Sequence, residues 1–354
     1  MSLRNPFVLA PMTTYASNKD LTLSSEEEAY YEQRGKQFGL VVTAATSISK
    51  QAQGFHRQIT VMNDSYLDSM TRLARAIKKG GAKAVLQLYH PGRMSLPNLF
   101  EGHEVVSASA VRANRDYTVT PRALTINEIY QVIDDFKQAA IRAMKSGFDG
   151  IELHGANTYL IQQFFSPHSN RRMDEFGGSL EKRMKFPLLL IETMIALRSE
   201  MNRDDFIIGY RLSPEEIEMP GITLTDTSHL ISKLSQTDLD YIHFSMGSYK
   251  QSSKRNPADS TPVIDRLRQS NVGQKPLIGV GQITTTKDVA EAKRLGYDLF
   301  AIGMAALADE AIVDHLINHQ PVKKVFDASS LLPKLMIERL KDWDHLKENG
   351  YEFK

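Results

Sequence analysis

The stretch TINEIYQVIDDFKQAAIRAMKSGFDGIELH, from Thr125 to His154, holds one complete helix–strand unit of this 354-residue chain. Its first four letters form a capping-box pattern, which predicts the start of a helix. Gly147 follows the helical pattern, where a helix C-terminus favours a left-handed residue. The apolar run Gly150–Leu153 then predicts a short strand that is buried on both faces.

The same unit recurs along the chain. Besides the helix at 126–146, helical patterns are expected at 64–79, 180–201, 225–235 and 285–295. Strands are expected at Phe7–Ala10, Leu40–Ala45, Ala84–Tyr89, Gly150–Leu153, Ile207–Leu212, Tyr241–Ser245, Pro276–Val280 and Leu299–Gly303. Alternating strands and helices predict a parallel α/β protein, and eight such strands predict closure into a (β/α)8 TIM barrel.

The competing architecture is a doubly wound sheet, which would carry a Gly-x-Gly-x-x-Gly turn after an early strand. The chain has no such turn. Residues 91–124 are polar and poorly periodic, so we expect an excursion or lid after the third strand, on the catalytic face. We expect one domain over 1–354, ending in a C-terminal tail at 325–354 with short helices.

Composition excludes several classes of function. Lys plus Arg total 43 and Asp plus Glu total 42, so the net charge of +1 gives no footprint for nucleic acid or an anionic membrane. The absence of cysteine excludes disulfides, thiolate-held clusters and Cys nucleophiles within the chain. We find no export signal and no apolar run near the roughly 18 residues of a membrane span. We therefore expect a soluble cytoplasmic protein that acts on a small molecule.

Polar residues at the C-terminal ends of barrel strands are the candidates for chemistry. His154, Asn157 and Tyr159 form the most suggestive cluster, because two neutral donors can hold one oxygen and a tyrosine can supply a proton. If a helical turn begins there, His154 and Asn157 share a face. The alternative is a core histidine with an amide cap. No second His or carboxylate stands at ligand spacing, so no metal site is expected.

Two further features leave alternatives open. Arg211 lies inside an apolar strand, where it could pair with Glu152 or hold an anionic ligand. Gly281 and Gly303 follow the last two strands, where they could admit a phosphate or only make tight turns. The acidic run at 26–28 is expected to be a solvated helix start.

Taken together, four motifs resemble the Old Yellow Enzyme family of FMN-dependent ene-reductases, in particular its bacterial NADH-type flavin oxidoreductases. The motifs are FVLAPMT at 7–13, QLYHPGR at 87–93, IELHGANTYL at 151–160 and SPHSNRRMDEFGGS at 166–179. The similarity runs from about residue 4 to about residue 318. It implies the TIM barrel, bound FMN, and NADH or NADPH as the hydride donor.

The resemblance also implies the role of each residue. Hydride would pass from NAD(P)H to flavin N5 and then to the β-carbon of an α,β-unsaturated carbonyl compound, in ping-pong order. His154 and Asn157 would hold the carbonyl oxygen, Tyr159 would protonate the α-carbon, and Tyr15 would face the substrate. The cofactor-binding residues would be Pro11, Met12, Thr13, Ala45, Gln87 and Arg211 at the flavin ring, with Gly281, Gln282, Gly303 and Met304 at the phosphate.

The chain departs from the family pattern in places. Met304 stands where the family commonly has an arginine, so the implied phosphate site rests more on backbone N–H groups. Glu310 replaces a usual proline, the segment before Asn5 is short, and the match is poor beyond about Val325.

Alternative functions remain open at this level. Another FMN barrel could act on a different donor or acceptor, such as a quinone, a nitro compound or a hydroxy acid. A flavin-binding sensor without turnover and a flavin-free phosphosugar barrel are the other candidates. The sequence does not name the physiological substrate, choose NADH over NADPH, or decide whether the chain forms a homo-oligomer.

Overall fold

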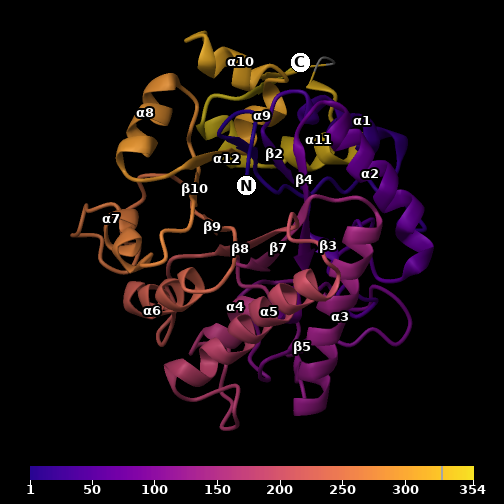
Figure 1. Ribbon diagram of the computed structural model, residues 1–354, viewed down its shortest axis with the longest axis vertical. Helices are drawn as coiled ribbons and strands as arrows, with labels where there is room; N and C mark the ends of the chain where they lie inside the picture. Colours follow the sequence, from indigo (N-terminus) through magenta and orange to yellow (C-terminus); the bar gives the residue numbers. More distant parts are fainter. Residues whose placement is uncertain (328–329) are drawn as a thin grey trace.

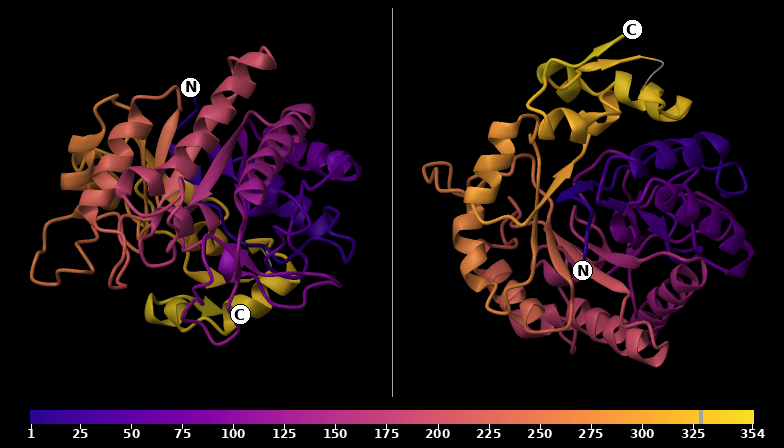
Figure 2. Two further views of the ribbon diagram at one scale, coloured as in Figure 1. Left: turned by 90° about the horizontal axis from the view of Figure 1, so that it is seen from below. Right: turned by 45° about the horizontal axis from the view of Figure 1, so that its top comes forward.

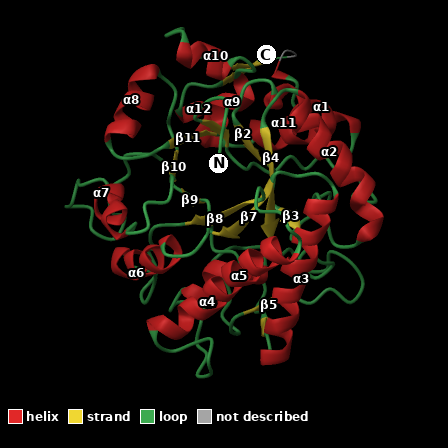
Figure 3. Cartoon of the chain, viewed as in Figure 1, coloured by secondary structure: helices red, strands yellow, loops and turns green. Residues whose placement is uncertain are grey.

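A closed barrel of parallel strands forms the centre of the molecule. The computed structural model describes residues 1–327 and 330–354. Each barrel strand pairs with the next, and the last pairs with the first, where Leu9 lies opposite Ile302. The predicted (β/α)8 barrel is therefore confirmed, with its helices outside the strands (Figure 1; Figure 3). The eight strands are β1 Phe7–Leu9, β2 Leu40–Val42, β4 Lys83–Tyr89, β7 Gly150–Gly155, β8 Ile207–Leu212, β9 Tyr241–Phe244, β10 Leu277–Val280 and β11 Leu299–Ile302.

The expected helical patterns all form helices, with small differences at their ends. The pattern at 64–79 divides into a 3₁₀ turn, η1 (Asp64–Tyr66), and a helix. In the described part of the chain, no helix has both the length and the apolar character needed to cross a membrane. The helices are α1 Ser25–Gly35, α2 Leu67–Lys79, α3 Ile126–Lys145, α4 Leu160–Phe165, α5 Leu180–Glu200, α6 Leu224–Ser235, α7 Val263–Leu267, α8 Thr286–Arg294, α9 Met304–Ala308 and α10 Ile312–Ile317.

The helix ends follow the local signals of the sequence. The capping box of α3 is formed, because Thr125 accepts from the backbone of Glu128 and the Glu128 carboxylate accepts from the backbone of Thr125. Gly147 has φ 82°, as a left-handed C-terminal residue requires. In the Gly80-Gly81 pair only Gly81 is left-handed, with φ 93°.

The barrel interior divides into an apolar layer and a polar layer. Residues alternate along each strand, so one set points into the barrel and the other toward the helices. The apolar layer is a buried cluster that includes Val8, Leu40, Val85, Ile207 and Ile278. Further along β4, β7, β8 and β9, the inward positions become polar. This polar layer, at the C-terminal end of the barrel, consists of Gln87, Glu152, His154, Arg211 and His243.

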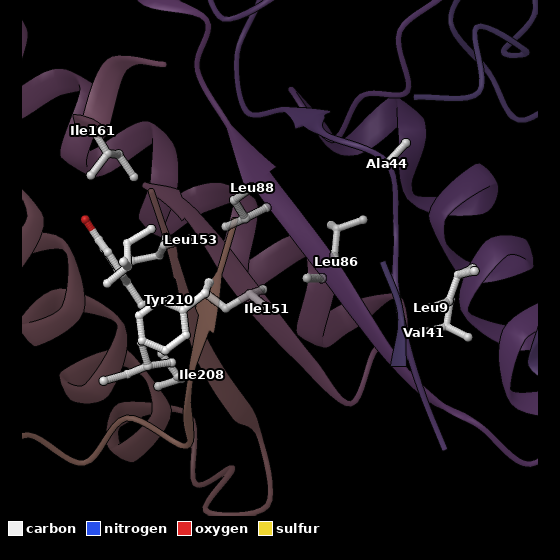
Figure 4. Close-up of a cluster of buried hydrophobic side chains, with 14 of the residues drawn as sticks. Leu9, Val41, Ala44, Leu86, Leu88, Ile151, Leu153, Ile161, Ile208 and Tyr210 are labelled. Atoms are coloured by element: carbon white, nitrogen blue, oxygen red, sulfur yellow. The ribbon is translucent and has the colours of Figure 1, made fainter. Parts of the chain in front are cut away.

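The main hydrophobic core lies between the strands and the surrounding helices. Ile151 and Leu153 of β7 are buried beside Ile208 and Tyr210 of β8 (Figure 4). Ile161 of α4 belongs to the same buried cluster. This outer core fixes β7 and β8 and so positions the polar side chains that point the other way.

Two segments extend the barrel at its catalytic end. The expected excursion contains η2 (Gly92–Met94), β5 (Val106–Ser107) and β6 (Arg122–Ala123), and a short strand β3 (Thr46–Ser47) pairs with β4. The expected short C-terminal helices are present, beside α9 and α10 (Figure 1; Figure 2). Positions 328 and 329 of the tail lie outside the described residues. The tail elements are β12 Val325–Phe326, α11 Lys334–Lys341, α12 Asp344–Glu348 and β13 Glu352–Phe353.

Candidate active site

A cavity of about 740 Å³ opens at the C-terminal ends of β1, β8, β10 and β11. Among the described residues, no Asp or Glu lines it. Six of its lining residues come from the C-terminal tail, which had no predicted role: Met336, Arg339, Leu340, Trp343, Asn349 and Tyr351. Lys324, one residue before the tail, also lines it. Most of the predicted cofactor and substrate residues also line it, namely Pro11, Met12, Thr13, Tyr15, Arg211, Gly281, Gln282, Gly303 and Met304.

The two loops expected to bind phosphate differ in how they use glycine. Gly281 has φ 99°, and a Cβ there would lie 2.6 Å from the backbone of Gly247. The backbone conformation and the packing of the chain therefore require glycine at this position, whether or not a ligand binds. At Gly303 a Cβ would meet nothing closer than 3.5 Å, at the Met12 sulfur. Its backbone is therefore open to the cavity. Phosphate binding at these loops stays a prediction.

Glu152 is the hub of the polar layer, and it is fully buried. Its carboxylate accepts hydrogen bonds from Gln87 Nε2 at 2.6 Å, Tyr241 OH at 3.1 Å and His243 Nδ1 at 2.8 Å. Burial acts to raise the pKa of Glu152, but His243, Arg211 and Gln87 together hold it below its ordinary value. The carboxylate therefore stays ionised.

Arg211 is buried in the polar layer without a partner of its own. Within the described residues it makes no hydrogen bond or ion pair, and its Nε atom is buried and unsatisfied. Burial lowers the pKa of the guanidinium, and the charge of Glu152 partly opposes this effect. The expected alternative of an Arg211–Glu152 bridge does not form, because Glu152 is occupied by three other donors. The charge of Arg211 is left to meet an anionic group in the cavity.

His154 is held as a neutral hydrogen-bond donor. Burial, followed by the charge of Arg211, lowers its pKa well below the ordinary value. Its Nδ1 atom accepts from the backbone N–H of Ala156 at 3.4 Å, which places the ring proton on Nε2. An N–H group is thus available for a substrate oxygen.

Asn157 reaches its position through a turn, and the helical turn considered as one possibility at His154 does not form. Asn157 and Thr158 have φ values of 55° and 63°, and α4 begins only at Leu160. The Asn157 Oδ1 atom accepts from Ser245 Oγ at 2.7 Å, so its amide N–H groups remain free to donate. Asn157 lines a second hollow of about 280 Å³, which shares Met246 and Gly247 with the main cavity.

Tyr159 lies edge-on to two aromatic rings. Its ring centroid is 4.9 Å from that of His154 and 4.5 Å from that of Tyr89. Burial, together with the nearby Tyr117 and Tyr15, raises the pKa of Tyr159 to about 12. The phenol therefore keeps its proton at neutral pH. Tyr117 belongs to the 91–124 excursion, which brings that segment next to this cluster.

Five predicted residues lie outside the lining of the main cavity: the cluster His154, Asn157 and Tyr159, and the predicted flavin contacts Ala45 and Gln87. Gln87 and Ala45 are buried outside its lining, where Gln87 donates to Glu152 and the Ala45 carbonyl accepts from Gln58 at 3.0 Å. The expectation of a solvated acidic run is wrong for Glu27. Its side chain is fully buried and accepts from Thr14 and Ser17, and burial raises its pKa. It anchors the loop that follows β1.

The C-terminal residues of the cavity carried only a weak signal in the sequence. In α11, Met336 and Leu340 stand four residues apart and are both buried, so the helix has one apolar face. This spacing predicts a docked helix, but not where it docks. Arg339 lies 5.4 Å over the ring of Tyr15, and this contact joins the tail to the loop after β1.

The chain matches known proteins over most of its length. Residues 1–322 match the model of the NADH:flavin oxidoreductase / NADH oxidase family. The NADH:acrylate oxidoreductase of Vibrio harveyi is 42% identical over 330 residues, which cover 92% of this chain and 33% of that protein. The NADH:fumarate oxidoreductase of Klebsiella pneumoniae is 41% identical over 309 residues, 86% of this chain and 33% of that protein. This chain therefore spans about a third of the length of these two relatives.

Other relatives are of similar size. A Bacillus subtilis protein named "Probable NADH-dependent flavin oxidoreductase YqiG" is 40% identical over 310 residues, which cover 87% of this chain and 82% of that protein. Among solved structures, morphinone reductase in complex with tetrahydroNAD superposes with a TM-score of 0.80 at 26% identity. The superposition covers 95% of this chain and 93% of that one.

Proposed function

This chain belongs to the NADH:flavin oxidoreductase / NADH oxidase family, and on that premise we propose that it is an FMN-dependent ene-reductase. The proposed reaction reduces the C=C bond of an α,β-unsaturated carbonyl compound at the expense of NADH. The observation that carries the proposal is the unpaired guanidinium of Arg211, which lines a cavity without acidic side chains among the described residues. A buried cation in such a place calls for an anionic ligand.

The residues of the cavity suit FMN. Its volume of about 740 Å³ lies in the range of cofactor pockets. Arg211 would stabilise negative charge at the N1 and O2 edge of the flavin, and Pro11, Met12 and Thr13 would lie along its ring. The backbone at Gly281, Gln282, Gly303 and Met304 would face the phosphate. Ala45 and Gln87 are also proposed to contact the ring, although the Gln87 side chain donates to Glu152 and the Ala45 carbonyl accepts from Gln58.

The chain's own residues would then act on the substrate. When bound, FMN supplies the redox chemistry by taking a hydride from NADH and giving one to the β-carbon of the substrate. The Nε2–H of His154 and the amide of Asn157 hold the carbonyl oxygen and stabilise its developing negative charge. Tyr159 donates its proton to the α-carbon.

An anaerobic visible spectrum of the purified protein tests the function as a whole. We expect flavin bands that bleach on addition of NADH and return on addition of 2-cyclohexenone. If the bands bleach but do not return, the protein is a flavin reductase that uses a different acceptor, such as a quinone or nitro compound. A protein that cannot be reconstituted with FMN would refute the proposal.

Replacing Tyr159 with Phe tests the proton donor. We expect enone turnover to fall about 100-fold, the lower end of what a general acid contributes, because water can deliver a proton in its place. Bleaching by NADH needs no proton from Tyr159 and should keep its rate. Stopped-flow absorbance of the two half-reactions separates these effects. Unchanged enone reduction would assign the proton to water or to another group.

The positive charge of the cavity favours a substrate that carries a carboxylate. Two relatives are named for acrylate and fumarate, which are unsaturated acids. Arg339 lies over Tyr15, the residue proposed to face the substrate, and it has no ion pair or hydrogen bond within the described residues. We therefore propose that Arg339 binds the carboxylate of an unsaturated acid.

An Arg339→Gln variant tests this substrate class. We expect KM for acrylate or fumarate to rise about tenfold, as for a lost charge-assisted hydrogen bond at an exposed site. The neutral substrate 2-cyclohexenone is the internal control, and its KM should stay within about twofold. Equal changes for acid and enone would contradict a role for Arg339 in charge recognition.

A further inference from the structure

The loops after β10 and β11 are expected to bind the FMN phosphate, but the residues by which they line the cavity carry no positive charge. The residues after β10 and β11 that line the cavity are Gly281, Gln282, Ile283, Thr284, Gly303, Met304, Ala305 and Leu307. None of these side chains is basic. A phosphate monoester carries a charge of about −1.5 to −2 at neutral pH. Backbone N–H groups alone would leave much of that charge without a counter-charge.

The segment that leads into the C-terminal tail brings a lysine to this end. Lys324 lines the same cavity, immediately before β12, which packs against α9. Its neighbour Lys323 donates its backbone N–H to Asp309 Oδ2 at 2.9 Å, which ties the segment to the end of α9. Because α9 begins at Met304, Lys324 is held on the side of the cavity where the phosphate is expected.

A buried arginine adds a second connection between the C-terminal segment and α9. Arg34 of α1 donates to the carbonyl oxygens of Ser330, at 2.7 Å, and Ala306, at 3.3 Å. It thereby links the tail and α9 through one side chain that is almost fully buried. These hydrogen bonds hold the start of the tail against α9.

The ammonium group of Lys324 has donors to spare. Its Nζ atom donates one hydrogen bond, to the Asn349 carbonyl at 3.0 Å, and lies 5.6 Å from the ring centroid of Tyr351. An ammonium group has three donors, so two remain. Lys324 is exposed and lines the cavity.

The other cations of this region are placed differently. Lys323 is paired with Glu310 and Asp327, so its charge is already balanced. Arg339 lies over Tyr15, at the loop after β1. Arg211 lies in the polar layer within the barrel.

We propose that Lys324 is the cation that binds the FMN phosphate, supplied by the segment that leads into the C-terminal tail in place of a basic residue on the loops after β10 and β11. This rests on the proposed FMN function. It gives this segment a role in cofactor selection, because the contact favours FMN over riboflavin, which lacks the phosphate.

The test compares FMN and riboflavin binding to the flavin-free protein, measured by the quenching of flavin fluorescence. For Lys324→Met we expect the Kd for FMN to rise about tenfold, the effect of one charge-assisted contact at an exposed position. The Kd for riboflavin should be unchanged, which also shows that the variant is folded. Lys324→Arg should restore most of the preference for FMN.

Arg339→Met is the matched control, since it removes a cation from another part of the same cavity. It should leave the ratio of the two Kd values unchanged. Equal loss of FMN and riboflavin affinity in Lys324→Met would overturn the phosphate contact, as would an equal loss of FMN preference in Arg339→Met. A wild-type protein that binds both flavins equally would also overturn it and leave the flavin function standing. Failure to bind either flavin would instead refute the proposed function.

Discussion

Replacing His154 with Ala should lower the turnover of an α,β-unsaturated carbonyl substrate about 100- to 1000-fold. The neutral Nε2–H group is one of two donors proposed to hold the substrate oxygen, and loss of one such donor costs about 3 kcal/mol of transition-state stabilisation. Reduction by NADH does not use this oxygen contact, so its rate should change far less. Single-turnover measurements of the two half-reactions check both statements.

The control is His229→Ala, which removes an exposed histidine of α6 and should leave both half-reactions unchanged.

The pH profile gives a second check on the wild type. Burial holds the pKa of His154 well below its ordinary value and raises that of Tyr159 to about 12. Between these limits His154 is neutral and Tyr159 is protonated. The enone half-reaction should therefore be flat from about pH 6 to 9. A break near pH 6.5 would show that His154 titrates in that range and contradict its role as a neutral donor.

The second large effect is on stability, in a Glu152→Leu variant. This change removes the carboxylate that accepts hydrogen bonds from Gln87, Tyr241 and His243. Among the described residues, it is also the only carboxylate that attracts Arg211. Breaking a buried charge network by removing one partner costs about 3–5 kcal/mol. The free energy of unfolding, from urea titration of the flavin-free protein, should fall by that amount.

The matched control is Glu200→Leu, which removes a carboxylate from the surface ion pair with Lys137. Such exposed pairs are worth about 0–1 kcal/mol.

The folded pKa of Glu152 is below its ordinary value. Its ionisation therefore stabilises the fold above the unfolded pKa, and this stability is lost as pH falls through the folded pKa. The difference between Glu152→Leu and wild type should shrink in acid. Equal losses in the two variants would contradict a special role for the buried network.

Local signals explain which parts of the fold were predictable. The capping box at Thr125, the glycine at 147 and the apolar runs of the eight strands each depend on residues near one another in the chain. The eightfold repeat of such units leaves few ways to bury their apolar faces. Thr158 shows the limit of local patterns, because its left-handed conformation replaced the helical turn that residue spacing suggested at His154.

The sequence by itself determined the barrel, since strand and helix periodicity act over a few residues and an eightfold alternation closes in one way. Through its motifs it also identified the residues proposed for the flavin and the substrate. The tertiary structure alone decided which groups have partners. The carboxylate of Glu152 is satisfied by residues of β4 and β9, Glu27 is buried under the loop after β1, and Arg211 is left unpaired. The tertiary structure alone also placed Lys324 and Arg339 in the lining of a cavity formed by loops far away in the chain. Burial and charge pairing depend on distances in space, and these exist only once the chain has closed on itself.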